Sequence, residues 1–206
     1  MKKILVIYVH GKNGSANEAN YYKKFFTNSE IVGFDYKAEN VWDFKQEFAN
    51  FFADINKNFD EIILIANSIG AYFSMNALQN KKISQAIFIS PIVDMEILIK
   101  NLMRMANVTE DELFAKKEIS TDFGENLSWK YLNYVRENKI FWDIPTQILY
   151  GENDNFTDKK IIFDFAKKIG AKVTVMTGGE HFFHTPEQMK FLDNWLEKIV
   201  KNFSCS

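Results

Sequence analysis

One short stretch, from Ile62 to Tyr72, constrains the fold of this 206-residue chain more than any other. It begins with an apolar run typical of a strand buried on both faces, and it continues into small residues that suit a tightly packed helix. Between these parts, residues 66–70 read small-x-Ser-x-Gly. A strand that turns sharply into a helix exposes the central side chain and directs the first helical N–H groups towards it. The pattern therefore predicts that Ser68 is a nucleophile, although serine is also a common helix N-cap.

The composition limits the class of protein. The chain has 25 Lys and Arg against 27 Asp and Glu, a net charge of −2, so no excess of positive charge favours nucleic acid or anionic membranes. No apolar run approaches the length of a membrane span. Cys205 is the only cysteine, which excludes an internal disulfide and fits a reducing compartment. We expect a cytoplasmic protein with no membrane span and no nucleic-acid partner.

Apolar segments that predict strands alternate with amphipathic segments that predict helices along most of the chain. The predicted strands cover residues 4–9, 30–36, 62–66, 83–90, 146–150 and 172–176. The predicted helices cover residues 16–28, 41–59 and 69–80, a segment capped by Thr157 that ends at Gly170, and a segment that begins at Pro186. The alternation predicts an α/β fold with a doubly wound, mostly parallel sheet of about six strands.

Residues 92–143 interrupt this alternation, because they contain helical patterns and no predicted strand. The first predicted helix has an apolar stripe, the second opens with a capping box at Thr109, and the third is capped by Ser128. An insert of roughly fifty residues is longer than an ordinary crossover. It would leave the sheet at the edge that exposes Ser68. We therefore expect a single domain over residues 1–206 with a helical lid at about 92–143, and extra packing without a substrate role is the alternative.

Side chains suited to nucleophilic catalysis follow several of the predicted strands. Ser68 follows the third strand, Asp154 the fifth and His181 the sixth. The carboxyl ends of parallel strands meet at one edge of a sheet, where ligands collect. A serine needs a base to become a nucleophile, and the base needs an acid that fixes its tautomer and stabilises the imidazolium ion. The order Ser, Asp, His therefore predicts a catalytic triad.

The acid of this triad has two rivals. Asp158 lies close to Asp154 but could instead cap the next helix, and Asp94 follows the fourth predicted strand. Asp154 stands three residues after Gly151, directly beyond a strand. This spacing favours Asp154 as the acid.

The base has one rival, His184, which lies three residues after His181 and close to a capping box that starts at Thr185. We expect His184 to be structural or to line the entrance of the site. Both histidines and Glu180 could be regarded as metal ligands, but no further Cys or His cluster accompanies them. We therefore expect no metal and no cofactor.

Four segments of the chain occur in the order found in α/β-hydrolases, and the sequence resembles this superfamily over nearly its whole length. These segments are His10-Gly11, Ala66-Asn67-Ser68-Ile69-Gly70, Tyr150-Gly151-Glu152-Asn153-Asp154 and Gly179-Glu180-His181-Phe182-Phe183. Within the superfamily, the chain is similar to small, lidded serine hydrolases of the esterase and serine-aminopeptidase-like kind. It departs from the family pattern at Ala66, which replaces the first elbow glycine, and in lacking two N-terminal strands of the full-size fold.

The resemblance implies an oxyanion hole made by the backbone N–H of Ile69 and by one from the first loop, that of Lys12, with Asn13 as the alternative. It also implies a serine hydrolase that cleaves a small-molecule carboxylic ester through an acyl-Ser68 intermediate. An amide or thioester hydrolase on the same triad, and a hydrolase-like binding protein without turnover, are the alternatives. We further expect an apolar acyl pocket. Its predicted members are Met95, Leu98, Met103, Phe123, Trp129 and Phe182.

Overall fold

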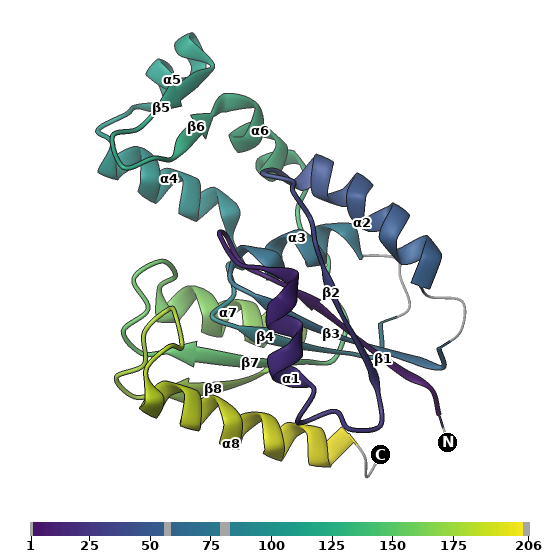
Figure 1. The fold of residues 1–206 in the computed structure, drawn as a ribbon. Coiled ribbons are helices and arrows are strands. Elements are labelled where there is room, and N and C mark those ends of the chain that lie inside the picture. Colours follow the sequence, from purple (N-terminus) through teal and green to yellow (C-terminus); the bar gives the residue numbers. More distant parts are fainter. Residues whose placement is uncertain (1, 56–58, 79–82, 204–206) are drawn as a thin grey trace. The chain divides into compact units, whose positions relative to one another are not determined.

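The computed structural model describes residues 2–55, 59–78 and 83–203, and its centre is a six-stranded sheet (Figure 1). Cys205 lies outside the described residues. The strands are β1 (Ile4–Val9), β2 (Glu30–Phe34), β3 (Glu61–Asn67), β4 (Gln85–Ile89), β7 (Thr146–Gly151) and β8 (Lys172–Met176), in the spatial order β2-β1-β3-β4-β7-β8. Every neighbouring pair in this sheet is parallel. The predicted doubly wound parallel sheet is therefore confirmed.

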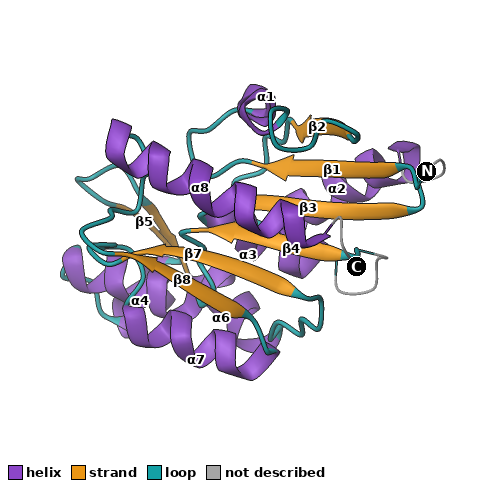
Figure 2. Cartoon of the chain, turned by 90° about the horizontal axis from the view of Figure 1, so that it is seen from below, coloured by secondary structure: helices purple, strands orange, loops and turns teal. Residues whose placement is uncertain are grey.

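Helices cover both faces of this sheet (Figure 2). One face carries α1 (Ala19–Tyr22), which follows the short 3-10 helix η1 (Ala16–Glu18), and α8 (Pro186–Phe203). Tyr22 of α1 and Trp195 of α8 belong to the same buried cluster as Val6 and Ile65 of the strands. The other face carries α2 (Val41–Ile55), α3 (Ile69–Ala77) and α7 (Lys159–Ile169). Strand residues thus alternate between two apolar cores, as a doubly wound fold requires.

The predicted helix over residues 16–28 is wrong in its extent. After α1 the chain continues through hydrogen bonds of i to i+3 spacing, from Lys23 N to Asn20 O (3.3 Å) and from Phe25 N to Tyr22 O (3.0 Å). Asparagine and aromatic residues have low helix propensities, and this segment consists largely of them. Because the helix propensity is low, the packing of the aromatic side chains against the buried cluster decides the conformation of this segment.

The chain divides into two compact units, one formed by Met1–Val93 with Trp142–Ser206 and the other by Asp94–Phe141. The second unit contains α4 (Met95–Met105), α5 (Glu110–Lys116), β5 (Glu118–Ser120), β6 (Asn126–Ser128) and α6 (Trp129–Glu137). The predicted caps are confirmed, since Thr109 Oγ1 accepts a hydrogen bond from Glu112 N (3.2 Å) and Ser128 Oγ from Tyr131 N (3.3 Å). A role of this unit as a lid stays a prediction.

The expectation that residues 92–143 contain no strand is wrong. β5 and β6 pair as an antiparallel hairpin, with Ile119 opposite Leu127. The turn between them contains Gly124 at φ +84°, a conformation that glycine adopts without steric cost. Three-residue strands are too short to give a recognisable alternating pattern, but this turn glycine is a signal that the sequence does carry.

An ion-pair cluster holds the three helices of the Asp94–Phe141 unit together. Arg136 of α6 contacts Glu96 of α4 through Nε (2.9 Å) and Glu110 of α5 through Nη2 (2.7 Å). Glu96 also pairs with Lys100 (3.0 Å) and Lys139 (3.3 Å). Hydrogen bonds from Lys100, Arg136 and Lys139 lower the pKa of Glu96 to about 2. The folded unit therefore favours the ionised form of this carboxyl group.

Acidification is expected to remove this contribution to stability. A carboxyl group with a lowered pKa in the folded state stabilises the fold above the unfolded pKa, here 4.5, and loses that effect as the pH falls towards about 2. Arg136→Gln should therefore lower the unfolding temperature at pH 7, and the gap to the wild type should shrink between pH 4.5 and 2. Thermal unfolding at several pH values measures this gap. Lys167→Gln on α7 is the control, and a gap for Arg136→Gln that stays constant down to pH 2 would contradict the assignment.

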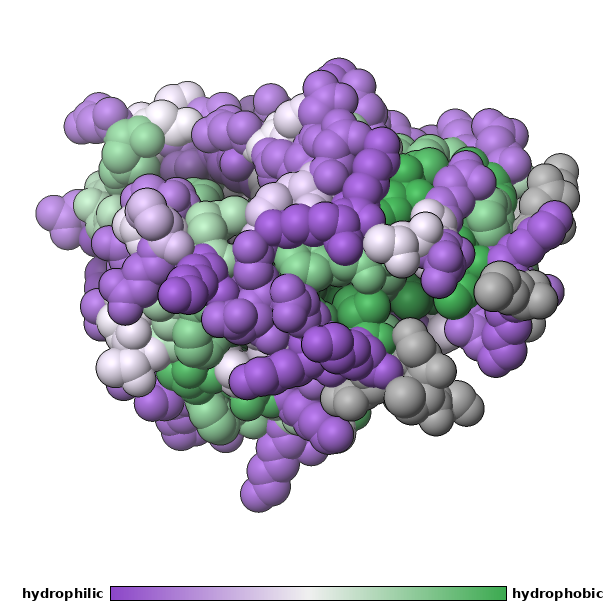
Figure 3. Space-filling view, turned by 60° about the horizontal axis from the view of Figure 1, so that its bottom comes forward, coloured by the Kyte–Doolittle hydropathy of each residue, from purple (hydrophilic) through white to green (hydrophobic). Residues whose placement is uncertain are grey.

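None of the helices in the described part of the chain combines the length and the apolar character that crossing a membrane requires. On the face drawn in Figure 3, hydrophilic residues cover much of the surface and hydrophobic residues gather between them.

Candidate active site

The turn between β3 and α3 holds Ser68 in an unusual backbone conformation. Ser68 has φ 49° and ψ −122°, a region that residues with side chains rarely adopt. The end of β4 and the loop after it hold this residue on both sides, because Ser68 N donates to Ile89 O (3.0 Å) and Ile92 N donates to Ser68 O (3.0 Å). The Ser68 side chain occupies the N-cap position of α3, but it accepts no capping hydrogen bond from the described amides of that helix. Its hydroxyl group is thus left for another partner.

Glycines allow the first loop and the elbow to approach each other closely. A Cβ atom on Gly70 would lie 2.4 Å from His10 O and 2.8 Å from Val9 O, so only glycine fits in this turn of α3. A Cβ atom on Gly11 would lie 3.1 Å from Ser68 Cβ. The loop that follows β1 therefore lies directly against the serine.

A polar network that runs from the interior to the surface holds the residue before the serine. Asn67 Nδ2 donates to the hydroxyl oxygen of Tyr8 (2.9 Å), and the Tyr8 hydroxyl group donates to the Glu18 carboxylate. Burial raises the pKa of Tyr8 above its usual value of 10.0, so its phenol remains a neutral donor. Glu18 in turn accepts a hydrogen bond from Ser15 N (2.8 Å) in the capping box of η1. The elbow is thereby connected to the loop after β1 through side chains as well as backbone.

Three predicted residues from three loops meet beyond the ends of the strands. His181 Nε2 lies 2.8 Å from Ser68 Oγ, and His181 Nδ1 lies 2.7 Å from Asp154 Oδ2. The side chains are almost fully enclosed, with 3% of His181 and 0% of Asp154 exposed. When Nδ1 carries the proton, it donates a hydrogen bond to the Asp154 carboxylate. Nε2 is then free to accept the proton of the Ser68 hydroxyl group. This arrangement allows proton transfer from serine to histidine.

Asp154 is held by the backbone of its own turn. Its Oδ1 atom accepts hydrogen bonds from Phe156 N (2.8 Å) and Thr157 N (3.1 Å), which leaves Oδ2 for His181. A Cβ atom on Gly151 would lie 2.4 Å from Glu180 O, so the turn after β7 lies close against the loop that carries the histidine. Asp154 and His181 are thus positioned by directly adjacent backbone segments.

Both rival carboxylates are helix caps in the structure. Asp158 Oδ1 accepts a hydrogen bond from Lys160 N (2.7 Å) at the start of α7, and Asp94 Oδ1 accepts one from Ile97 N (3.0 Å) at the start of α4. The predicted cap of α7 at Thr157 is therefore wrong by one residue. Thr157 is buried and its carbonyl oxygen accepts a hydrogen bond from the Tyr150 hydroxyl group (2.8 Å), so Asp158 is the residue left to cap the helix.

His184, the rival base, lies at the surface. Its side chain is 64% exposed, and its Nδ1 atom lies 2.8 Å from Phe182 O and 3.7 Å from Glu180 Oε2. The predicted capping box beside it is confirmed, because Gln188 N donates to Thr185 Oγ1 (3.2 Å) and Thr185 N to Gln188 Oε1 (3.3 Å). Among the residues described, no three His, Cys, Asp or Glu side chains are gathered so as to hold a metal ion.

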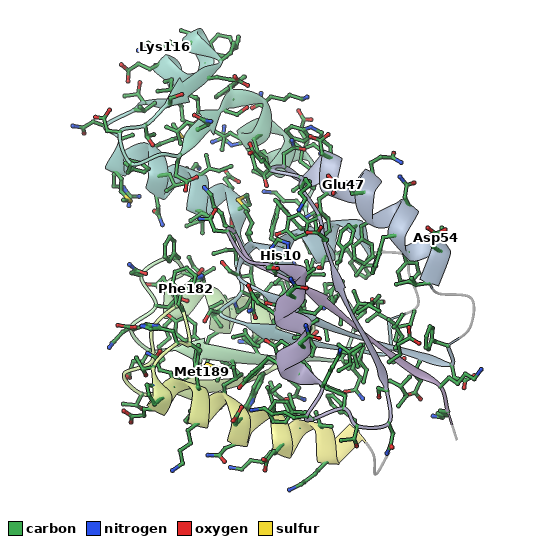
Figure 4. All side chains as sticks on the ribbon, viewed as in Figure 1. His10, Glu47, Asp54, Lys116, Phe182 and Met189 are labelled. Atoms are coloured by element: carbon green, nitrogen blue, oxygen red, sulfur yellow. The ribbon has the colours of Figure 1, made fainter. Side chains whose placement is uncertain are left out.

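The predicted oxyanion donors lie on the two segments that border Ser68. Ile69 is the first residue of α3, so its N–H group has no acceptor within the helix. Lys12 lies in the loop after β1, where His10 is stacked on Tyr36 with ring centroids 4.2 Å apart. Tyr36 also donates from its hydroxyl group to His10 O (2.8 Å), and burial raises the pKa of Tyr36 so that it stays protonated. Figure 4 labels His10 on this loop.

The predicted acyl-pocket residues fall into two groups. Phe182, labelled in Figure 4, is 60% exposed and its ring centroid lies 5.1 Å from that of His181. The other predicted residues all belong to the Asp94–Phe141 unit, so their part in substrate binding stays a prediction. In that unit Met95 and Met103 are buried, Leu98 and Trp129 are partly buried, and Phe123 is exposed.

The six-stranded parallel sheet and its flanking helices match the α/β-hydrolase fold of solved structures, which confirms the predicted fold. Est1E from Butyrivibrio proteoclasticus is 13% identical with a TM-score of 0.78, over 100% of this chain and 90% of that one. Alpha/beta hydrolase domain-containing protein 10 from mouse is 16% identical with a TM-score of 0.77, over 97% and 90%. The Pyrococcus furiosus esterase Pf2001 is 16% identical with a TM-score of 0.63, over 97% and 82%.

No protein-family model matches the sequence, and no curated protein is detectably similar to it in sequence. The similarity to known proteins is therefore one of fold, and a fold alone does not determine the chemistry of a site.

Proposed function

We propose that this chain is a serine hydrolase that cleaves a small carboxylic ester through an acyl-Ser68 intermediate. The observation that supports this most is the continuous path of hydrogen bonds from Asp154 through His181 to Ser68, which ends on a strained strand-to-helix turn. Strain of this kind persists where the surrounding structure enforces it, and it is common at nucleophiles. The Pyrococcus furiosus protein Pf2001, which shares the fold, is named as an esterase, and this agrees with the proposal.

Acylation begins when Ser68 Oγ attacks the carbonyl carbon of the ester and its proton passes to His181 Nε2. The resulting imidazolium ion is stabilised by the Asp154 carboxylate on Nδ1. The tetrahedral intermediate collapses as its bond to the alcohol oxygen breaks and His181 Nε2–H gives its proton to that oxygen. Water then attacks the acyl group with His181 as the base, which releases the acid and restores the Ser68 hydroxyl group.

The charge on the carbonyl oxygen needs donors that are in place before the reaction. We assign this role to the backbone N–H groups of Ile69 and Lys12, with Asn13 as the alternative in the first loop. The Ile69 amide lies at the positive end of α3, which favours a developing negative charge. The close contact between Gly11 and Ser68 keeps the first loop beside the nucleophile.

Trapping of the acyl-enzyme tests the proposal. A fluorophosphonate should add to Ser68, as located by peptide mass spectrometry, and a chromogenic ester should give a burst of alcohol followed by steady turnover. An ester, a thioester and an anilide with the same acyl group would rank the bonds that are cleaved. Preferred cleavage of the amide or thioester would mean that the chain is an amide or thioester hydrolase and not an esterase. If neither labelling nor turnover were observed, a hydrolase-like binding protein would be the only alternative left.

We also propose that residues 92–143 form a lid whose apolar side chains contact the acyl group. Met103→Ala and Trp129→Ala should each change the ratio of kcat/KM between short and long acyl esters by about tenfold, since a methylene contact accounts for about 1–3 kcal/mol. A ratio is insensitive to loss of folded protein. Met105→Ala, which removes a 70% exposed side chain from the same helix, is the matched control. Unchanged ratios in both variants would contradict the lid.

A further inference from the structure

Two phenylalanine rings lie against the imidazole ring of His181. The ring centroid of Phe156 is 4.7 Å from that of His181, and the ring centroid of Phe182 is 5.1 Å from it. The two phenylalanine rings contact each other as well, with centroids 6.3 Å apart and an interplanar angle of 77°. Phe156 comes from the turn that carries Asp154, whereas Phe182 directly follows the histidine. The imidazole ring is therefore bordered by apolar surface from two separate loops.

Both phenylalanine rings are exposed to solvent, so burial in the core does not account for their position. Phe156 is 43% exposed and Phe182 is 60% exposed, although the His181 side chain beside them is almost fully enclosed. Phe156 positions Asp154 through its backbone N–H group, which any residue except proline could supply. Its ring is not needed for that hydrogen bond. Adjacent exposed aromatic rings beside reactive groups are typical of a binding surface.

The proposed mechanism indicates which part of a substrate this surface would meet. His181 Nε2–H gives its proton to the alcohol oxygen when the ester bond breaks, so that oxygen has to lie within hydrogen-bond distance of Nε2. The carbon chain attached to it must then leave the site past the groups that border the imidazole ring. The acyl group is instead attached to Ser68, and its carbonyl oxygen points towards the Ile69 amide. The surface beside the histidine is therefore on the alcohol side of the ester.

We propose that Phe156 and Phe182 form a subsite for the leaving group, and that it selects esters of apolar, flat alcohols such as benzyl alcohol. This inference rests on the proposed serine-hydrolase function. It moves Phe182 from the acyl pocket, where the sequence suggested it, to the alcohol side, and it adds Phe156, which the sequence pattern does not single out. A flat apolar alcohol can stack against one ring and meet the edge of the other.

A series of esters with one acyl group and different alcohols tests this subsite. Benzyl butyrate and ethyl butyrate share the acyl-enzyme, so any difference between them arises before the alcohol leaves. The wild type should favour the benzyl ester in kcat/KM by about tenfold or more. Phe156→Ala and Phe182→Ala should each lower kcat/KM more for the benzyl ester than for the ethyl ester, so that the ratio between the two esters falls about tenfold. Phe163→Ala on α7, at 44% exposure, is the matched control and should keep the preference.

Several results would overturn the inference while leaving the proposed function intact. Equal losses for the benzyl and ethyl esters would mean that the rings only support the imidazole. A change in acyl-length preference among ethyl esters, with the alcohol preference unchanged, would return the rings to the acyl side. In both cases a fluorophosphonate should still label Ser68 in every variant. Loss of labelling and turnover in the wild type would instead overturn the proposed function, and the subsite with it.

Discussion

Replacement of Ser68 by alanine is expected to lower ester hydrolysis by a factor on the order of 10⁴ to 10⁶ and to abolish labelling by a fluorophosphonate. The reason is that Ser68 Oγ is the atom held 2.8 Å from His181 Nε2, and alanine offers no atom that can be acylated. The backbone bonds of residue 68 to Ile89 and Ile92 do not involve the side chain, so the variant should fold normally. Steady-state hydrolysis and circular dichroism measure the two effects.

A second serine provides a matched control. Ser74 lies in α3, and its buried hydroxyl group has no hydrogen-bond partner within the described residues. Ser74→Ala makes the same chemical change within the helix that follows Ser68 and should retain both labelling and turnover. Undiminished labelling of Ser68→Ala would show that the reactive group is another residue.

The parallel sheet could be predicted from the sequence because each central strand is buried on both faces. Residues 5–9 of β1 and 62–66 of β3 are all buried, and a continuous apolar run is the direct consequence of that environment. The elbow could be predicted for a similar reason. Only small side chains fit where α3 approaches β1, and the clash that a Cβ atom on Gly70 would make with His10 O explains the glycine.

The chain segments that the sequence did not reveal depend on tertiary contacts or on very short elements. The hairpin of β5 and β6 has three-residue strands, which cannot display a period. The short extent of α1 depends on the packing of aromatic side chains against the core. The cap of α7 at Asp158 depends on the burial of Thr157, which a local sequence pattern does not show.

In the candidate site, too, some residues could be predicted from the sequence and others depend on tertiary contacts. The order of Ser68, Asp154 and His181 beyond the strands could be read from the chain, and the structure places these side chains within hydrogen-bond distance. Phe156 could not be recognised, because a phenylalanine in a polar turn has no signature of its own. Its proximity to His181 arises only when two loops, distant in the sequence, come together.

Asp154→Asn is expected to lower kcat/KM for esters by roughly 10⁴-fold while leaving the fold intact. The structure gives a specific reason. The Phe156 and Thr157 amides both donate to Oδ1 of Asp154, and an asparagine would satisfy them with its carbonyl oxygen. Its NH₂ group would then face His181 Nδ1, which would have to accept a hydrogen bond. The proton would move to Nε2, the atom that must be free to receive the proton of Ser68.

The two rival carboxylates provide the controls for this prediction. Asp158 and Asp94 each cap a helix through one oxygen, and asparagine is about as good an N-cap as aspartate. Asp158→Asn and Asp94→Asn should therefore retain most of the activity, and the rate of phosphonate labelling should follow the same order as ester hydrolysis. A loss at Asp94→Asn as large as that at Asp154→Asn would place the acid after β4 instead of β7. Full activity of Asp154→Asn would show that the histidine needs no charged partner to select its tautomer.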